Sequence, residues 1–513
     1  MLNLPGKSES YWVATVADTA PDFPPLPGDL EVDVAIVGGG LVGLTAAELL
    51  RCAGKRVAVI EARKVGQQVT GRSTAKVTSQ HGPIYHRLIK DFGEDGARTY
   101  GAANQAGIER IARFVEELGI DCEFERKAAY VYTRSDRHVG EIEAEVEAAR
   151  RVGLPAGFVR ECSLPFPIAG AVRFDDQAQF NPCKYLAALA RAVAAGDGGR
   201  VFEGTRALSI EHGEPCRVTT NRGGTVTARD VIVATHMPIN NVGLFYAKAY
   251  PYAHPMVAAR IDPARAPDGM FISVETPTHS IRIARSSPDG AAYLVTVGDS
   301  YKTGHTDEGI KAFEDLVRFV REEFGAPSIE YHWTNEDFNS MDGVPFIGRA
   351  SSGSEHLFVA TGFNAWGITS ATVAGMILSD LIVGRANPWA GLFDATRTKP
   401  VAGGPSFVRE NVSAGVHLVK GYVQGRPRSI AEVAPGDGAV LKLNGEQVAV
   451  HRDERGNVHA VSAVCTHLRC VVGWNPADRT WDCPCHGSRF DVDGGVIHGP
   501  ATTDLERKSV DGS

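Results

Sequence analysis

The stretch Cys465-Thr466-His467, followed after fifteen intervening residues by Cys483-Pro484-Cys485-His486-Gly487-Ser488, decides the fold of the C-terminal part of this chain. Each stretch supplies one cysteine and one histidine, and two such pairs can hold a [2Fe–2S] cluster, with two thiolates on one iron and two imidazoles on the other. Two further cysteines, Cys470 and Cys485, could approach each other as the loops fold over the cluster, which makes a disulfide between them plausible. The alternatives are a zinc site or a disulfide pair with incidental histidines, although zinc prefers a closed tetrahedral set and has no use for the extra cysteine pair.

The two loops resemble the Rieske iron–sulfur domain, in the form that has Cys-Thr-His-x-x-Cys in the first loop and Cys-Pro-Cys-His-Gly-Ser in the second. The resemblance implies Cys465 and Cys483 on one iron, His467 and His486 on the other, and a disulfide between Cys470 and Cys485. From Gly425 the chain is rich in strands and short turns, and Gly499-Pro500 closes the module as in that family. We therefore expect an all-β Rieske domain over 427–513.

The bulk composition restricts the class of protein. With 43% hydrophobic and 22% charged residues it is an ordinary globular composition, and the net charge of −8 without a basic stripe argues against a nucleic-acid partner. Residues 1–22 lack the basic start and apolar core of a secretory signal, and the apolar run 34–47 is shorter than the ~20 residues that span a bilayer. The cysteines outside the cluster region are scattered singly, as in a reducing compartment. We expect no transmembrane segment and a cytoplasmic location.

A dinucleotide-binding βαβ unit is predicted near the N-terminus. The β-branched run 32–37 is followed by Gly38-Gly39-Gly40-Leu41-Val42-Gly43, a helical pattern to Cys52, a second strand over 56–60 and then Glu61. Gly38 allows the tight turn, Gly40 lets a pyrophosphate approach the backbone, and Gly43 lets the helix pack on the strand. The helix N-terminus favours the phosphates, and Glu61 can accept hydrogen bonds from a ribose diol. The alternative is a glycine-rich turn in an unrelated α/β fold.

The segment Gly71-Arg72-Ser73-Thr74-Ala75-Lys76 is small and polar. In this pattern the chain resembles the FAD-dependent oxidoreductases of the D-amino-acid oxidase and glycine oxidase superfamily, which implies FAD as cofactor and places Ser73 and Thr74 beside the isoalloxazine. Strand 230–235 resembles the one that returns beneath the FAD, and Val201 falls where that superfamily touches the adenine. His81 either approaches the flavin or is a structural hydrogen-bonder, and the structural role is favoured.

The match to this superfamily is more specific over 342–382, where a strand and a glycine-bracketed turn lead into a helix from Ile368. The resemblance implies that the N-terminus of this helix meets the pyrimidine end of the flavin, with backbone contacts from Gly362, Gly367 and Ile368. A helix dipole directed there would stabilise negative charge on reduced flavin. Trp366 either lines the substrate cavity or packs in the core.

Short strands between His236 and Glu330 imply, by the same resemblance, an antiparallel substrate sheet that faces the flavin. Arginines on that sheet would suit a carboxylate, because the guanidinium fork binds it through two hydrogen bonds. Arg282 and Arg285 are the candidates, although a surface salt bridge is the commoner role for either one alone.

The expected architecture is an α/β (α+β) FAD-binding Rossmann-type domain with an antiparallel substrate sheet, plus a C-terminal all-β Rieske domain. Residues 1–31 are proline-rich and should form an extended surface arm without chemistry. The oxidoreductase spans 32–393, with FAD-binding parts at about 32–235 and 340–393 and the substrate sheet at about 236–339. Residues 394–426 form an ordered linker. Amphipathic spacing predicts helices over 104–118 and 141–152, and another helix spans 183–195.

Flavin accepts two electrons at once and can release them singly, whereas a [2Fe–2S] cluster carries one, so the pair converts hydride chemistry to single-electron transfer. The expected function is oxidation of a small amine or amino-acid-like substrate at FAD, with electrons relayed through the cluster to an acceptor protein or quinone, by a dehydrogenase rather than an oxidase. The alternatives are reversed flow, in which a redox partner reduces the flavin through the cluster, and a non-enzymatic redox sensor. No catalytic base stands out, and the weak catalytic candidates are His81, Arg282 and Trp366.

The residue two positions after Ser488 bears on the potential of the cluster. Rieske centres of the respiratory cytochrome bc type have a tyrosine there, and its hydroxyl donates a hydrogen bond that raises the potential, as the serine hydroxyl also does. This chain has Phe490, which has no hydroxyl. Since hydrogen bonds to the cluster tune its potential, we predict a value below that of the respiratory centres.

Overall fold

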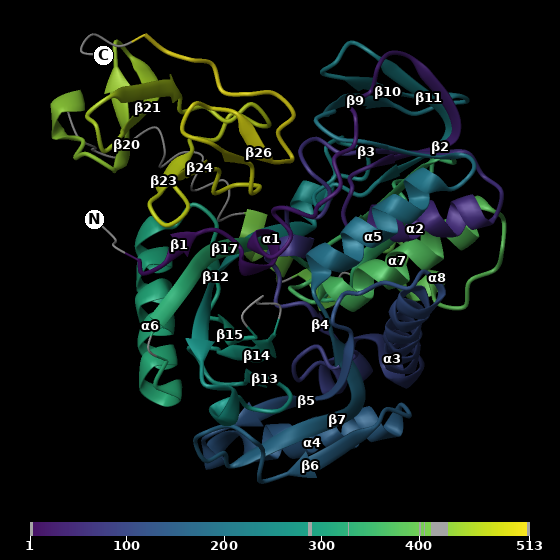
Figure 1. Cartoon of the computed structure of the whole chain (residues 1–513). Helices are drawn as coiled ribbons and strands as arrows, with labels where there is room; N and C mark the ends of the chain where they lie inside the picture. The colour runs from purple at the N-terminus through teal and green to yellow at the C-terminus, as the bar shows by residue number, and fades with distance from the viewer. Residues whose placement is uncertain are drawn as a thin grey trace.

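The computed structural model describes residues 4–285, 290–326, 328–399, 402–404, 406–411 and 429–509. Three parts are visible in Figure 1: a parallel sheet with its helices, a larger mixed sheet flanked by α6 (Thr306–Phe324), and two small sheets near the C-terminus. Residues 412–426 of the expected linker lie outside the described residues. Residues 406–411, before that segment, are helical.

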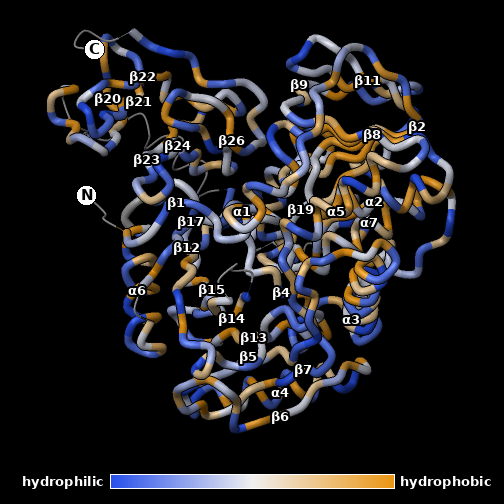
Figure 2. The backbone as a smooth tube through the Cα atoms, viewed as in Figure 1, coloured by the Kyte–Doolittle hydropathy of each residue, from blue (hydrophilic) through white to orange (hydrophobic). Residues whose placement is uncertain are grey.

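The first sheet has the strand order β18-β19-β11-β2-β3-β8, with β9 and β10 continuing from β11. Its central strands pair in parallel, with Val34 opposite Val57 and Ile36 opposite Ile232. These strands are covered on both faces, which explains their unbroken apolar runs. Figure 2 shows this apolar concentration around β2 and β8. The bounds are β2 (Leu30–Val37), β3 (Val57–Ile60), β8 (Gly199–Phe202), β9 (Ala207–Glu211), β10 (Cys216–Thr220), β11 (Thr225–Val233), β18 (Phe346–Arg349) and β19 (Leu357–Thr361).

The helices α2 (Leu41–Cys52), α5 (Pro182–Ala195) and α7 (Gly367–Ile382) lie together beside this sheet (Figure 1). The Asn181 side chain caps α5 by accepting hydrogen bonds from the amides of Cys183 and Lys184, with Pro182 in the first turn. The predicted helices are present, although 104–118 is the second half of a longer helix, α3 (Tyr85–Glu117), which is kinked at Gly93. The other helices here are α4 (Val139–Arg151) and α8 (Ala390–Phe393).

The larger sheet has the order β1-β17-β12-β15-β14-β13-β5-β7-β4 and is mostly antiparallel. It is not confined to 236–339 as expected, because four strands from 76–179 extend it: β13 pairs with β5, placing Phe271 opposite Tyr130. The bounds are β4 (Lys76–Val77), β5 (Glu125–Thr133), β6 (Ala156–Val159), β7 (Gly170–Gln179), β12 (Ala249–Ile261), β13 (Met270–Ser273), β14 (Ser280–Ala284), β15 (Ala292–Val297), β16 (Tyr301–Lys302) and β17 (Ser328–Ser340).

The N-terminal segment is more than the extended surface arm that its prolines predict. Strand β1 (Lys7–Ser8) pairs with β17, and the short helix α1 (Tyr11–Ala14) buries Tyr11 and Trp12 completely. The Trp12 indole donates a hydrogen bond to the carbonyl of Ser73 at 2.8 Å, and the Ser10 hydroxyl donates one to that of Gly71 at 2.5 Å. Two large aromatic side chains bury enough apolar area to fix this segment in the core.

The C-terminal part is all-β, as predicted. Strands β20 (Gly438–Leu443), β21 (Glu446–Arg452) and β22 (Val458–Ser462) form one antiparallel sheet, and β23 (Gly473–Asn475), β24 (Thr480–Asp482), β25 (Arg489–Phe490) and β26 (Val496–His498) form the other. Trp481 and Phe490 are fully buried and pair across β24 and β25. The cluster loops join these strands.

Candidate flavin cavity and iron–sulfur centre

A cavity of about 350 Å³ lies where the parallel sheet, the larger sheet and the C-terminal domain meet. Its volume is typical of small-molecule and cofactor sites. The glycine turn after β2, the segment 68–76, the start of α7 and the loop 496–502 all contribute to its wall. The cavity is therefore built from both halves of the chain.

The glycine turn fits a bound dinucleotide. Gly38 has a φ of +115°, and a Cβ there would lie 2.4 Å from the carbonyl oxygen of Ala234. A Cβ on Gly43 would lie 2.0 Å from the Gly38 oxygen, so the helix can pack this closely only with glycine. Gly40 is the N-cap of α2 and lines the cavity, where a Cβ would meet only Thr70 Oγ1, at 3.6 Å. A side chain at Gly40 would project into the space that a pyrophosphate needs.

Glu61, which follows β3, lines the same cavity. Its carboxylate accepts hydrogen bonds from the amides of Gly39 (2.8 Å) and Arg63 (2.9 Å), and burial raises its pKa. These contacts orient the carboxylate beside the glycine turn, which suits a ribose hydroxyl. Three predicted cofactor residues are not among the residues that line the cavity: Gly43 packs against Gly38, Val201 pairs with Val59 inside the sheet, and a Cβ on Gly362 would lie 3.0 Å from Ser340.

The N-terminus of α7 opens onto the cavity, which Trp366, Gly367 and Ile368 line. Its positive dipole end therefore faces the space that a cofactor would occupy. The His81 ring stacks on the Trp366 ring, with 5.1 Å between the ring centroids. His81 also hydrogen-bonds the hydroxyl of Tyr100 (2.6 Å) and the carbonyl of Thr78 (2.7 Å). Burial lowers the pKa of His81 to about 3. His81 is thus a neutral structural residue that supports Trp366.

Ser73, Thr74 and Lys76 line the cavity together. The Lys76 ammonium or amine nitrogen lies 2.6 Å from the carbonyl oxygen of Phe271 and 2.6 Å from Ser280 Oγ, and burial lowers its pKa well below the usual value. A neutral amine that donates its two hydrogens to these two acceptors keeps one lone pair free. Sequence reasoning missed Lys76, since one lysine at the end of a small polar segment shows nothing of its burial.

Arg282 is neither a carboxylate-binding residue of the cavity nor part of a surface salt bridge. It is 3% exposed and donates hydrogen bonds to the carbonyls of Thr74 (3.1 Å), Ala75 (2.9 Å) and Phe180 (3.0 Å). Burial lowers its pKa to about 9. The side chain therefore supports, from outside the cavity, the segment that lines it. Arg285 is exposed and is not among the lining residues.

The cluster loops bring the four predicted iron ligands together. Cys465 and Cys483 are each 1% exposed, the neighbouring Cys483 thiol lowers the pKa of Cys465, and the ring centroids of His467 and His486 lie 5.1 Å apart. Both histidines have a buried Nδ1 atom without a hydrogen-bond partner among the described residues, and burial lowers the pKa of each to about 4. Neutral imidazoles with a free nitrogen and two adjacent thiols are the donors that a [2Fe–2S] centre of this type requires.

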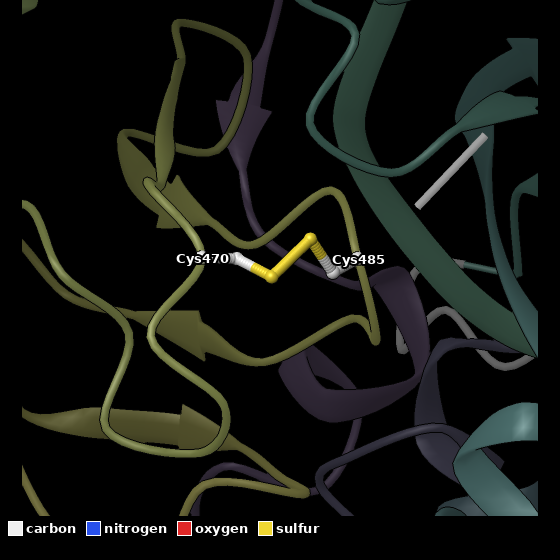
Figure 3. The surroundings of a disulfide bond; sticks show 2 residues. All are labelled: Cys470 and Cys485. Atoms are coloured by element: carbon white, nitrogen blue, oxygen red, sulfur yellow. A yellow bond between two sulfur atoms is a disulfide. The ribbon is translucent and has the colours of Figure 1, made fainter. Parts of the chain in front are cut away.

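Figure 3 shows the disulfide between Cys470 and Cys485, which joins the two loops as predicted. The sulfur of Cys483 also lies within 4.8 Å of both disulfide sulfurs. Since those two sulfurs are bonded to each other, Cys483 is the one thiol of the three that can act as an iron ligand.

The two sites share a wall. Tyr246 packs its ring against both His467 (5.4 Å) and His486 (5.1 Å), so the histidine edge of the centre faces the oxidoreductase domain. Arg206, which lines the cavity, pairs with Asp504 at 2.9 Å and donates to the carbonyl of Val496 at 2.7 Å. His498 of β26 lines the cavity directly. Sequence reasoning identified none of these three residues, because their neighbours are distant in the chain.

No helix in the described part of the chain combines the length and apolar character needed to cross a bilayer.

Family models match both halves of the chain. Residues 33–381 match the model described as FAD dependent oxidoreductase, and residues 427–508 match the Rieske [2Fe-2S] domain. The chain is 37% identical to YhfW of Bacillus subtilis (strain 168), which carries the provisional name of a Rieske 2Fe-2S iron–sulfur protein, over 98% of both chains. It is 26% identical to gamma-glutamylputrescine oxidoreductase of Escherichia coli (strain K12), over 77% of this chain and 92% of that one.

Solved structures show the fold of the first part. Glycine oxidase from Geobacillus kaustophilus matches with a TM-score of 0.58 at 20% identity, over 72% of this chain and 99% of that one. L-proline dehydrogenase from P. horikoshii matches with a TM-score of 0.57 at 20% identity, over 72% and 98%. Together with the glycine turn and the four predicted cluster ligands, the family matches show that the chain belongs to the FAD dependent oxidoreductases and carries a C-terminal Rieske domain, so that its cofactors are FAD and a [2Fe–2S] cluster.

Proposed function

We propose that this protein oxidises a small amine at FAD and passes the electrons singly through the Rieske cluster to an external protein or quinone, as a dehydrogenase rather than an oxidase. FAD supplies a hydride acceptor, and the cluster supplies a one-electron carrier. The observation that carries the proposal is that His498 of the Rieske domain lines the same cavity as the glycine turn and the start of α7. This shared wall supports a direct exchange of electrons within one chain.

The charges around the cavity favour an amine over a carboxylate substrate. Three cations line it, but Lys64 is paired with Glu203 (2.8 Å) and Arg206 with Asp504 (2.9 Å). The third, Lys76, has a lowered pKa, and Arg282 is committed to backbone carbonyls. Asp299 and Asp337 also line the cavity. Asp337 is held by His236 at 2.6 Å, but no lining cation among the described residues is free to pair with a carboxylate, and the Asp299 carboxylate suits a substrate that enters as an ammonium ion.

Lys76 is the proposed general base. Hydride transfer from the carbon next to nitrogen requires the neutral amine, so an ammonium substrate must first lose a proton. The neutral Lys76 amine, held by Phe271 and Ser280, can accept it. The name of the Escherichia coli relative, a gamma-glutamylputrescine oxidoreductase, is consistent with amine substrates.

An anaerobic screen of the holoenzyme against amines and matched amino acids tests this function. We expect an amine to bleach the flavin absorbance and a reduced-cluster EPR signal to follow. A Cys483→Ser variant should still bleach its flavin but should reduce no external acceptor. If only a protein donor reduces the flavin, electrons flow in the reverse direction, from the cluster to the flavin. If the cluster never exchanges electrons with the flavin, the protein is a redox sensor and not an enzyme of this kind.

A further inference from the structure

Four titratable side chains lie in a row where the flavin cavity meets the Rieske domain. Asp337, His236 and His498 line the cavity, and Glu336 precedes Asp337 on β17. His236 Nε2 lies 2.6 Å from Asp337 Oδ1, and His236 Nδ1 lies 3.3 Å from His498 Nε2. The two imidazole rings are stacked, with centroids 5.2 Å apart and an angle of 11° between their planes. His498 Nδ1 lies 3.8 Å from Glu336 Oε1.

The hydrogen-bond partners of Asp337 determine which nitrogen of His236 carries a hydrogen. The Asp337 carboxylate accepts hydrogen bonds from the amides of Phe338 (2.7 Å) and Ala365, so it is an acceptor toward His236 as well. This assigns a hydrogen to His236 Nε2 and leaves His236 Nδ1 as a lone pair. The 3.3 Å contact with His498 then becomes a hydrogen bond only when His498 Nε2 carries a hydrogen.

Glu336 terminates the row at the domain interface. It is 3% exposed, and neither carboxyl oxygen has a hydrogen-bond partner among the described residues. A Cβ on Gly487, in the second cluster loop, would lie 2.2 Å from Glu336 Oε1, so the glycine allows the carboxyl group to reach that loop. A buried carboxyl group without hydrogen bonds has an increased proton affinity, so a change of charge nearby can change its protonation.

Other charges face these groups. Arg489 Nε lies 3.9 Å from Glu336, and Asp482, Asp337 and Asp478 also act on it. Burial raises the pKa of Glu336 well above its usual value, Arg489 opposes this shift, and the three aspartates add to it. Arg489 and Arg72 face His498 and, with burial and His236, lower its pKa. An electron placed on the nearby cluster adds negative charge and increases the proton affinity of Glu336 further.

We propose that His498 and Glu336 form a proton path from the flavin cavity to the domain interface, with His236 as the acceptor that orients His498, and that Glu336 takes up a proton when the cluster takes up an electron. This inference rests on the proposed function. An amine that becomes an imine gives up two electrons and two protons, one as the proton accepted by Lys76 and one within the hydride. When the two electrons leave singly for the iron and then for the external acceptor, the hydrogen nucleus of the hydride remains in the cavity as a proton.

One proton can pass along this row and leave each imidazole nitrogen with a hydrogen or a lone pair that suits its partner. With Glu336 ionised, His498 carries its hydrogen on Nδ1, and a lone pair of each ring faces the other. A proton that enters between the rings binds His498 Nε2, and His498 releases its Nδ1 hydrogen to Glu336. The distance of 3.8 Å between His498 and Glu336 requires a small approach of the carboxyl group or one bridging water for this last step.

Infrared difference spectroscopy of the holoenzyme, with the cluster reduced at an electrode, tests this path directly. We expect reduction to add one C=O band of a protonated carboxyl group, which Glu336→Gln removes and Glu330→Gln, on the same strand, retains. A band that persists in Glu336→Gln, or no band in the unaltered protein, would overturn the proposal. Because the electrode replaces the substrate, this result does not depend on whether an amine reduces the flavin, so the two proposals fail separately.

A second variant covers the case in which Glu336→Gln does not fold. His498→Phe keeps a ring against His236 but removes both nitrogens. We expect it to abolish the carboxyl band and to slow electron transfer from flavin to cluster at least tenfold, with loss of the solvent isotope effect. An unchanged band together with an unchanged rate and isotope effect would contradict the path.

Discussion

The guanidinium carbon of Arg282 lies 4.8 Å from the centroid of the Trp12 indole, so a residue of the N-terminal segment stacks on a residue of the substrate sheet. Both side chains reach the segment that lines the flavin cavity from behind: Trp12 donates to the carbonyl of Ser73, and Arg282 donates to those of Thr74 and Ala75. The N-terminal segment thus helps to shape the cofactor site from outside it.

Replacing Trp12→Ala should therefore weaken both the fold and FAD retention. Truncation of a fully buried aromatic side chain costs about 3–5 kcal/mol, and the lost hydrogen bond releases the Ser73 carbonyl. We expect a lower unfolding midpoint and a higher dissociation constant for FAD, measured by flavin fluorescence. Phe23→Ala, in the same segment but only partly buried, is the control and should lose much less. Unchanged FAD affinity in a destabilised Trp12→Ala protein would show that the contact is purely structural.

The parts of the molecule that the sequence predicted are those that local spacing determines. The glycine turn, the helix from Gly367 and the two cluster loops each need only a few consecutive residues to be recognised, and the disulfide between Cys470 and Cys485 follows from the loop type. Three other features depend on contacts between residues more than a hundred positions apart. They are the burial of Trp12, the position of Arg282 outside the cavity, and the pairing of β4–β7 with the larger sheet. Spacing along the chain contains no information on such contacts. The pairing of His236 with His498 is of the same kind, which is why the shared wall was not foreseen.

Replacing Lys76→Met should slow flavin reduction by an amine about 100-fold or more, the usual contribution of a general base. Burial lowers the pKa of Lys76, and the active form is the neutral amine, so the rate in the unaltered protein should rise with pH as Lys76 loses its proton. The variant should lack this rise. Stopped-flow flavin absorbance across a pH series measures both effects. Lys442→Met, an exposed lysine of the Rieske domain, is the control, and an unaltered pH profile in Lys76→Met would exclude this base.

A double variant, Cys470→Ser with Cys485→Ser, lacks the disulfide and should lose its cluster more easily than the unaltered protein. The bond closes a loop with a sequence separation of 15, for which the chain-entropy model gives about 3 kcal/mol. We expect a lower midpoint for loss of the cluster's visible absorbance on heating and a lower iron content after purification. Cys52→Ser changes an exposed free cysteine and should leave both unchanged. Equal cluster loss in the two variants would argue against a stabilising role for the bond.

The buried His81 should make the protein sensitive to acid. Its pKa is about 3 in the folded protein against 6.5 when unfolded, so its contribution is complete above pH 6.5 and is lost as pH falls toward 3. Between pH 7.5 and pH 5 this amounts to about 2 kcal/mol at 1.36 kcal/mol per pKa unit. Denaturant unfolding at the two pH values should show a smaller pH difference in His81→Gln than in the unaltered protein. His86→Gln, an exposed histidine nearby, should retain the full difference.

Replacing Phe490→Tyr should raise the midpoint potential of the cluster. Ser488, after Cys483, already helps to lower the pKa of the Cys465 thiol, and Phe490 is fully buried in the core of the Rieske domain without a group to donate. A new hydroxyl that reaches the Cys465 or Cys483 sulfur stabilises the reduced, more negative state, by about 1 kcal/mol for one hydrogen bond. For a one-electron couple that corresponds to roughly 40 mV, since 59 mV is a tenfold change in equilibrium constant. Voltammetry of the two proteins measures the shift, with Phe490→Leu as a control that alters packing but adds no donor. A midpoint in Phe490→Tyr that matches either the unaltered protein or Phe490→Leu would mean that this position does not set the low potential predicted for exchange with flavin.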